Sequence, residues 1–297
     1  MSIHCVRTPT EPFLTSSGKF RVHQVCVWQD NFSWLLVCEE TGEAAVIDGP
    51  EAQPVLDYCE LHSFQLTTIL NTHTHGDHIG INMELRSLGM LSGIKVVGSS
   101  RRAADIPGIS NPVDEGDVYS FGAIDCQVWL TEGHIDGHVS FLIDDVLFCG
   151  DTLFGGGCGY LFDGPPAKMQ RSLERFLTLP DSTRVCCAHE YTQDNLRFAW
   201  SVDAGNPHLE ARIADTWRAR SLGLSTVPSS IGLERMTNPF MRWGAASVRD
   251  AAKLFDPDLD VTDPVEVFAA TRRLKDSKAY RDLSDMALPL PTQVLPN

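Results

Sequence analysis

The stretch His73-Thr74-His75-Gly76-Asp77-His78 decides how the rest of the chain is interpreted. Imidazole nitrogens and carboxylate oxygens are the ligands that a divalent cation such as zinc accepts. In an extended segment the first two histidines point the same way and can share one ion. The aspartate and the third histidine lie beyond the glycine, where the chain bends, and can face a second ion. One motif therefore predicts two ions, and its density of ligands argues against a chance cluster of surface histidines.

This stretch follows the β-prone run 66–70, and three later β-prone runs also end just before a side chain that can bind metal. The later runs are 126–130, 146–150 and 185–188, and the side chains are His134, Asp151 and His189. Each of them alone could be a turn, cap or core residue. Chance would place such ligands at both ends of the strands, whereas a shared site at one edge of a sheet requires all of them to follow the carboxyl ends of their strands. We therefore expect a single site.

The predicted site has two ions and a shared ligand. His73, His75 and His134 are assigned to one ion, Asp77, His78 and His189 to the other, and Asp151 bridges both through its two oxygens. Ions about 3.5–4 Å apart can share one water, and coordination lowers the pKa of that water from about 15.7 to about 7. This chemistry favours a hydrolase over a redox enzyme, with Asp77 and Asp151 as the catalytic carboxylates. Zinc is the expected metal, although iron or manganese would bind the same donors. His138 is assigned a supporting or structural role.

The bulk composition is that of a globular protein of one or two domains, with 297 residues, 43% hydrophobic and 21% charged. The formal net charge of -15 argues against nucleic-acid binding, which needs clustered Lys and Arg. No apolar run has the length of a membrane span, and residues 1–15 lack the features of a signal peptide, so we expect a cytoplasmic protein. The nine cysteines include no C-x-x-C pair and are expected to be buried, reduced thiols.

Hydrophobic periodicity predicts strands and helices in the first two thirds of the chain. Turn-rich segments separate the strands 22–28, 33–39 and 43–48, which predicts an antiparallel meander. Helices are expected over 51–62, 79–90 and 165–179, a strand over 94–98 and a loop over 101–116.

The character of the sequence changes at about residue 191, where the β-prone runs stop. Helices are expected over 194–202, 207–222, 245–255 and 264–280, followed by a loose tail from Pro289. We therefore predict a catalytic domain over residues 1–190 and a helical domain over residues 191–297.

The metal motif and its later ligands resemble the metallo-β-lactamase fold superfamily. Further segments make the chain similar to one family within it, the hydroxyacylglutathione hydrolases (glyoxalase II). These segments are Asp30-Asn31-Phe32-Ser33-Trp34-Leu35, Gly150-Asp151-Thr152-Leu153-Phe154, Gly157-Cys158-Gly159, Cys187-Ala188-His189-Glu190-Tyr191-Thr192 and Asn238-Pro239-Phe240-Met241-Arg242. The metal motif alone specifies only the superfamily. The resemblance spans nearly the whole chain, including a helical C-terminal part that many superfamily members lack.

The resemblance implies an α+β fold, a four-layer αββα sandwich with the dimetal site at one edge and a C-terminal helical domain that binds substrate. It implies hydrolysis of S-(2-hydroxyacyl)glutathione, typically S-D-lactoylglutathione, to glutathione and a 2-hydroxy acid, the second step of methylglyoxal detoxification. Tyr191 would contact glutathione. Arg272 and Lys275, three apart on one helical face, would bind its glycyl carboxylate. Tyr160 stands where relatives usually carry Lys or Arg, and Phe162 where several carry Tyr, so acyl or thiol preference is expected to differ.

In the expected mechanism, a hydroxide shared by both ions attacks the thioester carbonyl while an ion stabilises the oxyanion. The leaving thiolate needs no general acid, because a thiol has a pKa of about 8.5. The nearest alternative is an iron-dependent glutathione persulfide dioxygenase. Another thioester hydrolase of this fold, a β-lactamase and a binding or regulatory protein are further alternatives. The expected partner is a small-molecule glutathione thioester, with no nucleic acid, no membrane and a monomeric chain.

Overall fold

Strands β2 (Phe20–Val27), β3 (Asn31–Cys38) and β4 (Glu43–Ile47) form the antiparallel meander that the sequence predicts. The computed structural model describes residues 5–290. The first sheet has the order β1-β2-β3-β4-β5-β6-β7, and the pairs from β4 to β7 are parallel. Its other strands are β1 (Phe13–Leu14), β5 (Gln65–Leu70), β6 (Lys95–Ser99) and β7 (Asn111–Val113).

The prediction of a loop over residues 101–116 is wrong in part. The segment contains the end of the 3-10 helix η2 (Ser100–Asp105) and the short strand β7, which pairs with β6. β7 is the last strand in the order of the first sheet, so Pro112 at its centre does not interrupt a ladder between two strands. The proline and glycine content that suggested a loop is therefore compatible with an edge strand.

The second sheet has the order β15-β14-β11-β10-β9-β8. Its strands are β8 (Val118–Phe121), β9 (Ile124–Leu130), β10 (Val139–Ile143), β11 (Val146–Gly150), β14 (Arg184–Cys187) and β15 (Ser229–Ser230). The runs predicted at 126–130, 146–150 and 185–188 correspond to β9, β11 and β14. A small hairpin of β12 (Leu153–Phe154) and β13 (Gly157–Cys158) leaves the sheet after β11.

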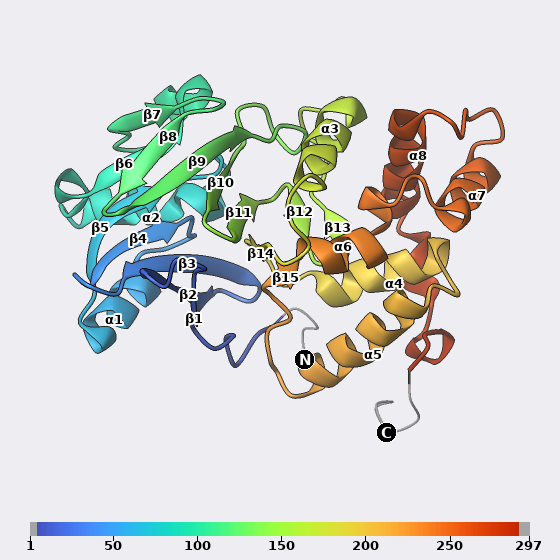
Figure 1. The fold of residues 1–297 in the computed structure, drawn as a ribbon, viewed down its shortest axis with the longest axis horizontal. Coiled ribbons are helices and arrows are strands. Elements are labelled where there is room, and N and C mark those ends of the chain that lie inside the picture. Colours follow the sequence, from blue (N-terminus) through green and yellow to red (C-terminus); the bar gives the residue numbers. More distant parts are fainter. Residues whose placement is uncertain (1–4, 291–297) are drawn as a thin grey trace.

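Side chains of β3 alternate between two hydrophobic cores, as a strand buried on both faces requires. Trp34 and Leu36 pack in the core shared with the second sheet, whereas Leu35 and Val37 pack with the helices. Helices α1 (Gln53–His62) and α2 (Gly76–Ser87) contribute to that second core, together with the short helix η1 (Leu91–Gly93). Helix α3 (Pro166–Phe176) covers the other sheet, where Phe176 stacks on Trp129 at 6.2 Å. Together these layers form the αββα sandwich that the resemblance implies (Figure 1).

The last third of the chain is mainly helical, as predicted, and lies on one side of the sandwich (Figure 1). Its helices are α4 (Thr192–Val202), α5 (Pro207–Ser221), α6 (Ile231–Thr237), α7 (Ala246–Phe255) and α8 (Pro264–Asp276), with the short helices η3 (Pro239–Met241), η4 (Ala279–Asp282) and η5 (Asp285–Ala287). Three details differ from the prediction. β15 falls in the part expected to lack strands, α6 is an additional helix, and the helix expected to reach residue 280 ends at Asp276.

One hydrophobic core crosses the predicted boundary at residue 190. Phe198, Phe240 and Phe268 belong to the same cluster as the residues between the two sheets. The division into two domains stays a prediction. Residues 1–4, part of the stretch examined for a signal peptide, and residues 291–297 of the predicted tail lie outside the described residues. The nine cysteines carry free thiols, and all except Cys5 and Cys26 are buried. Among the described helices, none combines the length and the hydropathy needed to cross a membrane.

Candidate active site

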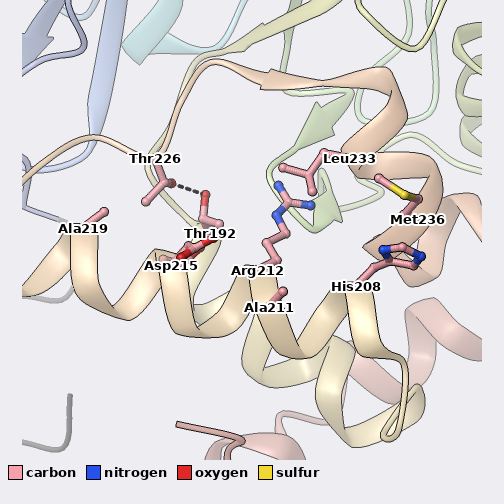
Figure 2. A pocket seen from close by; sticks show the side chains of 10 residues that line it. Thr192, His208, Ala211, Arg212, Asp215, Ala219, Thr226, Leu233 and Met236 are labelled. Atoms are coloured by element: carbon pink, nitrogen blue, oxygen red, sulfur yellow. Dashed lines mark hydrogen bonds between the residues drawn. The ribbon is translucent and has the colours of Figure 1, made fainter. Parts of the chain in front are cut away.

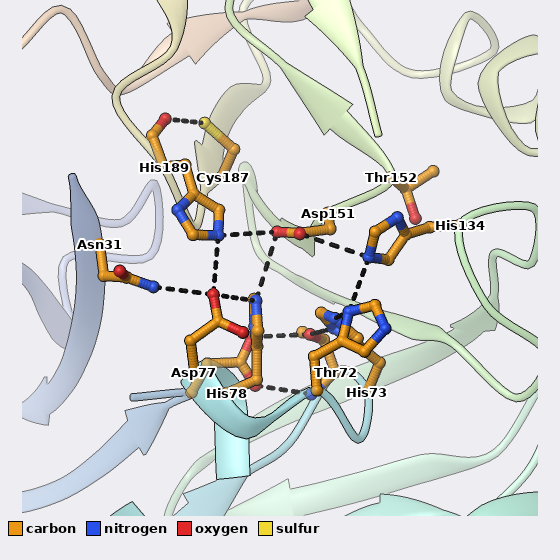
Figure 3. A network of polar contacts seen from close by, with 12 residues as sticks. Asn31, Thr72, His73, Asp77, His78, His134, Asp151, Thr152, Cys187 and His189 are labelled. Atoms are coloured by element: carbon orange, nitrogen blue, oxygen red, sulfur yellow. Dashed lines mark hydrogen bonds and ion pairs between the residues drawn. The ribbon is translucent and has the colours of Figure 1, made fainter. Parts of the chain in front are cut away.

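The seven predicted ligands come together where the two sheets meet. Figure 3 labels all of them except His75. His73 and His75 follow β5 of the first sheet, and Asp77 and His78 lie in the first turn of α2. His134, Asp151 and His189 follow β9, β11 and β14 of the second sheet. The prediction that the site lies at the edge of a single sheet is therefore wrong. Face-to-face packing brings the ends of strands from both sheets together. α2 also begins at Gly76, not at the expected residue 79, so its first turn carries two of the side chains.

Three imidazoles and one carboxylate oxygen form the first group. Nδ1 of His75 lies 3.0 Å from Nε2 of His73 and 3.0 Å from Nε2 of His134. Oδ2 of Asp151 lies 3.4 Å from Nε2 of His134. Atoms that each lie about 2.1 Å from a tetrahedral ion are about 3.4 Å from one another. The spacing of this group therefore fits one cation.

The second group faces the other carboxylate oxygen of Asp151. Nε2 of His189 lies 3.3 Å from Oδ2 of Asp77, and Nε2 of His78 lies 3.7 Å from the same oxygen. Oδ1 of Asp151 lies 3.4 Å from both of these nitrogens. Asp151 thus presents one oxygen to each group, which is the geometry of a ligand shared between two ions.

Two atoms of this cluster are buried without any hydrogen-bond partner, Nε2 of His78 and Oδ1 of Asp151. A buried polar atom left unpaired carries a desolvation cost of about 1–3 kcal/mol. A divalent cation would satisfy both atoms, since imidazole nitrogen and carboxylate oxygen are donors that it accepts. The residues present therefore fit a pair of metal ions.

The pKa shifts of His73, His75 and His134 agree with this fit. Burial lowers the pKa of His73, His75 and His134, which favours the neutral form that binds metal. Burial also acts to lower the pKa of His189, but the carboxylates of Asp151 and its neighbours outweigh it and raise the pKa to about 10. A cation bound beside His189 would take the place of the proton that these carboxylates now favour.

Asp48 supports the site and was not among the predicted residues. Its Oδ2 lies 2.9 Å from Nδ1 of His78 and accepts a 2.6 Å hydrogen bond from the hydroxyl of Thr72. Its Oδ1 accepts from the backbone N–H of Thr72 at 2.8 Å. Asp48 therefore fixes the ring of His78 with Nε2 toward the cluster. The sequence pattern could have indicated Asp48, because it lies at the end of a predicted strand, much as Asp151 follows one.

Asp48→Asn is expected to weaken metal binding by roughly 10- to 100-fold, the usual effect of losing such a supporting carboxylate. Asn tolerates the left-handed backbone at this position, where φ is 55°, so the change mainly removes the charge beside His78. Competition with a chelator, followed by metal analysis, measures the affinity. Asp125→Asn, an exposed carboxylate on β9, is the matched control. Equal affinity in wild type and Asp48→Asn would contradict the role assigned to Asp48.

Other side chains orient the remaining ligands. Oδ1 of Asp30 lies 3.2 Å from Nδ1 of His189, and Asn31 donates a 3.1 Å hydrogen bond to Asp77. His138, predicted to have a supporting role, is buried behind the cluster and accepts from the backbone N–H of Asp151 at 3.2 Å through Nε2. The segment 30–35, which carries part of the family resemblance, therefore also supplies two side chains that orient ligands, Asp30 and Asn31.

The segment that follows the β12–β13 hairpin passes directly beside the cluster. A methyl group added to Gly159 would lie 2.1 Å from the backbone oxygen of Asp151 and 3.0 Å from Nδ1 of His134, so only glycine permits this approach. The backbone oxygen of Tyr160 lies 2.7 Å from Nδ1 of His134. The ring of Phe162 contacts those of His75 and His134, with centroids 5.2 and 5.3 Å apart.

The predicted substrate-binding residues of the C-terminal part lie beside the same hairpin. The ring of Tyr191 stacks on that of His189 at 4.8 Å. Arg272 and Lys275 are buried on α8, and Arg272 donates to the backbone oxygen of Cys158 at 3.3 Å. Nε of Arg272 has no hydrogen-bond partner, and Nζ of Lys275 contacts Oδ1 of Asn195. Arg272 thus contacts the hairpin directly, whereas Lys275 contacts Asn195, which donates a 3.0 Å hydrogen bond to the backbone oxygen of Gly155 in the turn of the hairpin.

A separate cavity of about 340 Å³ lies between α5, α6 and the start of α4 (Figure 2). Arg212 forms part of its wall and makes a 2.5 Å ion pair with the buried Glu234. The other oxygen of Glu234 accepts a 2.8 Å hydrogen bond from the backbone N–H of Gly156. This buried pair therefore anchors the turn of the β12–β13 hairpin from behind.

Comparison with known families agrees with this geometry. The family description "Hydroxyacylglutathione hydrolase C-terminus" matches residues 190–278, and "Metallo-beta-lactamase superfamily" matches residues 127–189. The chain is 43% identical over 258 residues to the hydroxyacylglutathione hydrolase of Synechococcus sp. (strain JA-3-3Ab), which covers 86% of this chain and 99% of that protein. The enzyme of Rhodospirillum rubrum is 42% identical over 257 residues, covering 86% of this chain and 97% of its own length. The chain belongs to the hydroxyacylglutathione hydrolase family.

Solved structures show that this member of the hydroxyacylglutathione hydrolase family shares its fold with more distant proteins. ETHE1 from Myxococcus xanthus superposes with a TM-score of 0.55 at 24% identity, covering 88% of this chain and 95% of that one. A metallo-beta-lactamase family protein from Thermus thermophilus gives a TM-score of 0.52 at 17% identity, covering 88% and 94%. At these identities the likeness concerns the fold alone. The two family matches also meet at residues 189 and 190, where the sequence predicts the change from the catalytic to the helical part.

Proposed function

We propose that this member of the hydroxyacylglutathione hydrolase family hydrolyses S-(2-hydroxyacyl)glutathione, with S-D-lactoylglutathione as the typical substrate. The observation that carries the proposal is Asp151, whose two oxygens each lie 3.4 Å from imidazole nitrogens of a different donor group. A shared carboxylate of this kind suits two ions that act on one carbonyl group. The names of the relatives favour thioester hydrolysis over the alternative persulfide oxidation.

The proposed metal content is two divalent cations, most simply zinc. Nitrogen and oxygen donors without a thiolate suit zinc, and iron or manganese would also bind them. When bound, such ions polarise a carbonyl oxygen and make hydroxide available near neutral pH. We also propose that residues 1–190 carry the chemistry, that residues 191–297 bind the carrier, and that the chain acts as a monomer in the cytoplasm without nucleic-acid or membrane partners.

The chain's own residues hold the substrate at both ends of the site. Asp151 orients the reacting groups by joining the two donor sets, and Asp77 completes the second of them. Arg272 and Lys275 bind the glycyl carboxylate of glutathione, because Nε of Arg272 is a buried donor without a partner and Lys275 lies three residues further along α8. Tyr191, stacked on His189, lies where it can contact the tripeptide between these ends.

The direct test is thiol release from S-D-lactoylglutathione and from a panel of other thioesters, with and without a chelator. We expect release from the glutathione thioester, loss of activity after chelation and recovery with zinc. Oxygen uptake with glutathione persulfide is measured in parallel. Uptake without thioester hydrolysis would replace the proposal with the dioxygenase alternative.

The binding of an anionic thioester is expected to weaken above about pH 7. Burial, with Arg272 nearby, lowers the pKa of Lys275 to about 7. The free enzyme therefore loses the positive charge of the Lys275 amine as the pH rises through this value. The other charged or titratable groups around it are Asp194, Cys158 and Arg281. A bound carboxylate favours the protonated amine, so KM should rise roughly fivefold between about pH 6.5 and about pH 8.5 while kcat changes less.

Lys275→Met is the control for this pH dependence, because it keeps most of the length of the side chain and removes the titrating amine. Its KM should be higher than that of wild type at about pH 6.5 and nearly independent of pH. A wild-type KM that stays flat over this range, or the same rise in the variant, would show that Lys275 does not bind the carboxylate.

A further inference from the structure

The cavity of about 340 Å³ between α5, α6 and the start of α4 lies outside the cluster of metal-ligand side chains (Figure 2). Its volume is at the lower end of the range for pockets that hold small molecules. One face of α5 forms most of the wall, from His208 to Ala219, so the cavity follows this helix over about three turns. Such a space is large enough for a ligand and is not used by the proposed hydrolysis.

The two ends of the cavity differ in polarity (Figure 2). The apolar side chains of Leu233 and Met236, from α6, lie at one end. Thr192 and Thr226 lie toward the other end, where their hydroxyl oxygens are 2.6 Å apart. An amphipathic molecule therefore matches the wall better than a uniformly apolar or a uniformly polar one.

Thr216 offers the cavity a buried polar group. Its side chain lines the cavity, and the residue is only 5% exposed. Among the described residues, none forms a hydrogen bond with its hydroxyl. A buried hydroxyl without a partner is unfavourable, so a ligand that supplies a hydrogen-bonding group at this position gains affinity.

The charges around the cavity disfavour an anion. Arg212, the cation of its wall, is already neutralised by the 2.5 Å ion pair with the buried Glu234. Asp215, on the same face of α5, is an exposed carboxylate. A ligand carboxylate would therefore lose hydration without gaining a free cation.

We infer that this cavity is a second binding site, for a small neutral alcohol or phenol. The apolar body of the ligand lies against Leu233 and Met236, and its hydroxyl pairs with Thr216. An aromatic body gains a further contact with the sulfur of Met236. This site is independent of the proposed thioester hydrolysis, so either can fail without the other.

The test is a titration of the full-length protein with para-butylphenol, followed by NMR of isotope-labelled methionine methyl groups. Met236→Leu assigns the signal of Met236. This signal is expected to shift in a saturable way, with a Kd of about 1 mM or lower. Met83 and Met286 are 52% and 86% exposed and do not line the cavity, so their signals should stay unchanged. Shifts of all three signals, or none for Met236, overturn the inference.

A second ligand tests the class of molecule. Para-butylbenzoate keeps the apolar body and carries a negative charge in place of the neutral hydroxyl. It is expected to bind at least about tenfold more weakly than the phenol, because its carboxylate must be desolvated without a free cation. Equal affinities for the two compounds would show that the cavity does not select a neutral ligand.

Two variants test the position of the ligand. Ala211→Phe places a ring in the cavity and should abolish the saturable binding, whereas Ala246→Phe, at an exposed position of α7 outside the cavity, should bind as wild type does. Thr216→Val keeps the shape of the side chain and removes its hydroxyl, so the Kd for para-butylphenol should rise about fivefold. Urea denaturation confirms that each variant is folded. Wild-type affinity in Ala211→Phe or in Thr216→Val overturns the inference.

Discussion

Asp151→Ala is expected to lower kcat/KM for S-D-lactoylglutathione by about 10³-fold or more. The carboxylate is shared by the two donor groups, so its loss removes a ligand from both predicted ions at once. Loss of a single charge-stabilising group in an active site already costs about 10²- to 10³-fold. The measurement is thiol release at saturating zinc, together with metal analysis of the purified variant, which should hold less than the wild-type amount.

Glu174→Ala, an exposed carboxylate on α3, is the control for the loss of a negative charge and should retain wild-type activity and metal content. The proposed site would be wrong if Asp151→Ala hydrolysed the thioester at the wild-type rate. Reduced activity with two tightly bound ions would instead confine the role of Asp151 to orienting the substrate.

Glu234→Leu is expected to destabilise the protein by about 3–5 kcal/mol, because it leaves the charge of Arg212 buried and unpaired. The side chains of Arg212 and Glu234 are 4% and 0% exposed. Glu234 also accepts hydrogen bonds from Gly156, Asn238 and Ser229, which lose their acceptor in the variant. Urea denaturation measures the change in the free energy of unfolding.

The double variant Arg212→Met with Glu234→Leu tests the reason for this effect. Removing both charges should recover part of the lost stability, because no isolated charge then remains at this buried position. Glu210→Leu, at an exposed position of α5, should change the free energy of unfolding by less than about 0.5 kcal/mol. A loss in Glu234→Leu no larger than that of Glu210→Leu would show that the buried pair does not support the hairpin.

The meander of β2, β3 and β4 could be predicted because each strand carries its own signal. Apolar β-prone residues fill each strand, and turn residues separate neighbouring strands, as Gly42 does between β3 and β4. The strands β7 and β15 carry weaker signals. β7 consists of three residues around a proline, and β15 of two serines, so their extended conformation depends on pairing with β6 and β14. Local sequence preferences cannot reveal such strands.

The residues that orient the ligands also differ in how far the sequence could predict them. His138 follows a glycine in a turn, and nothing in its sequence neighbourhood shows that it accepts from the backbone of Asp151. Asp48 ends a predicted strand, but its contact with His78 joins residues 30 positions apart. Such contacts depend on how strands and helices pack, and the spacing of residues along the chain does not specify that packing.

The sequence by itself determined which side chains can bind metal and the family to which the chain is similar, because ligand chemistry and motif spacing are local properties. Only the tertiary structure decided that these side chains come from two sheets, that Asp151 presents one oxygen to each donor group, and that Phe162 lies exposed beside His75. The reason is that packing two sheets face to face brings the ends of distant strands within a few ångströms, and distances through space are set by the whole fold.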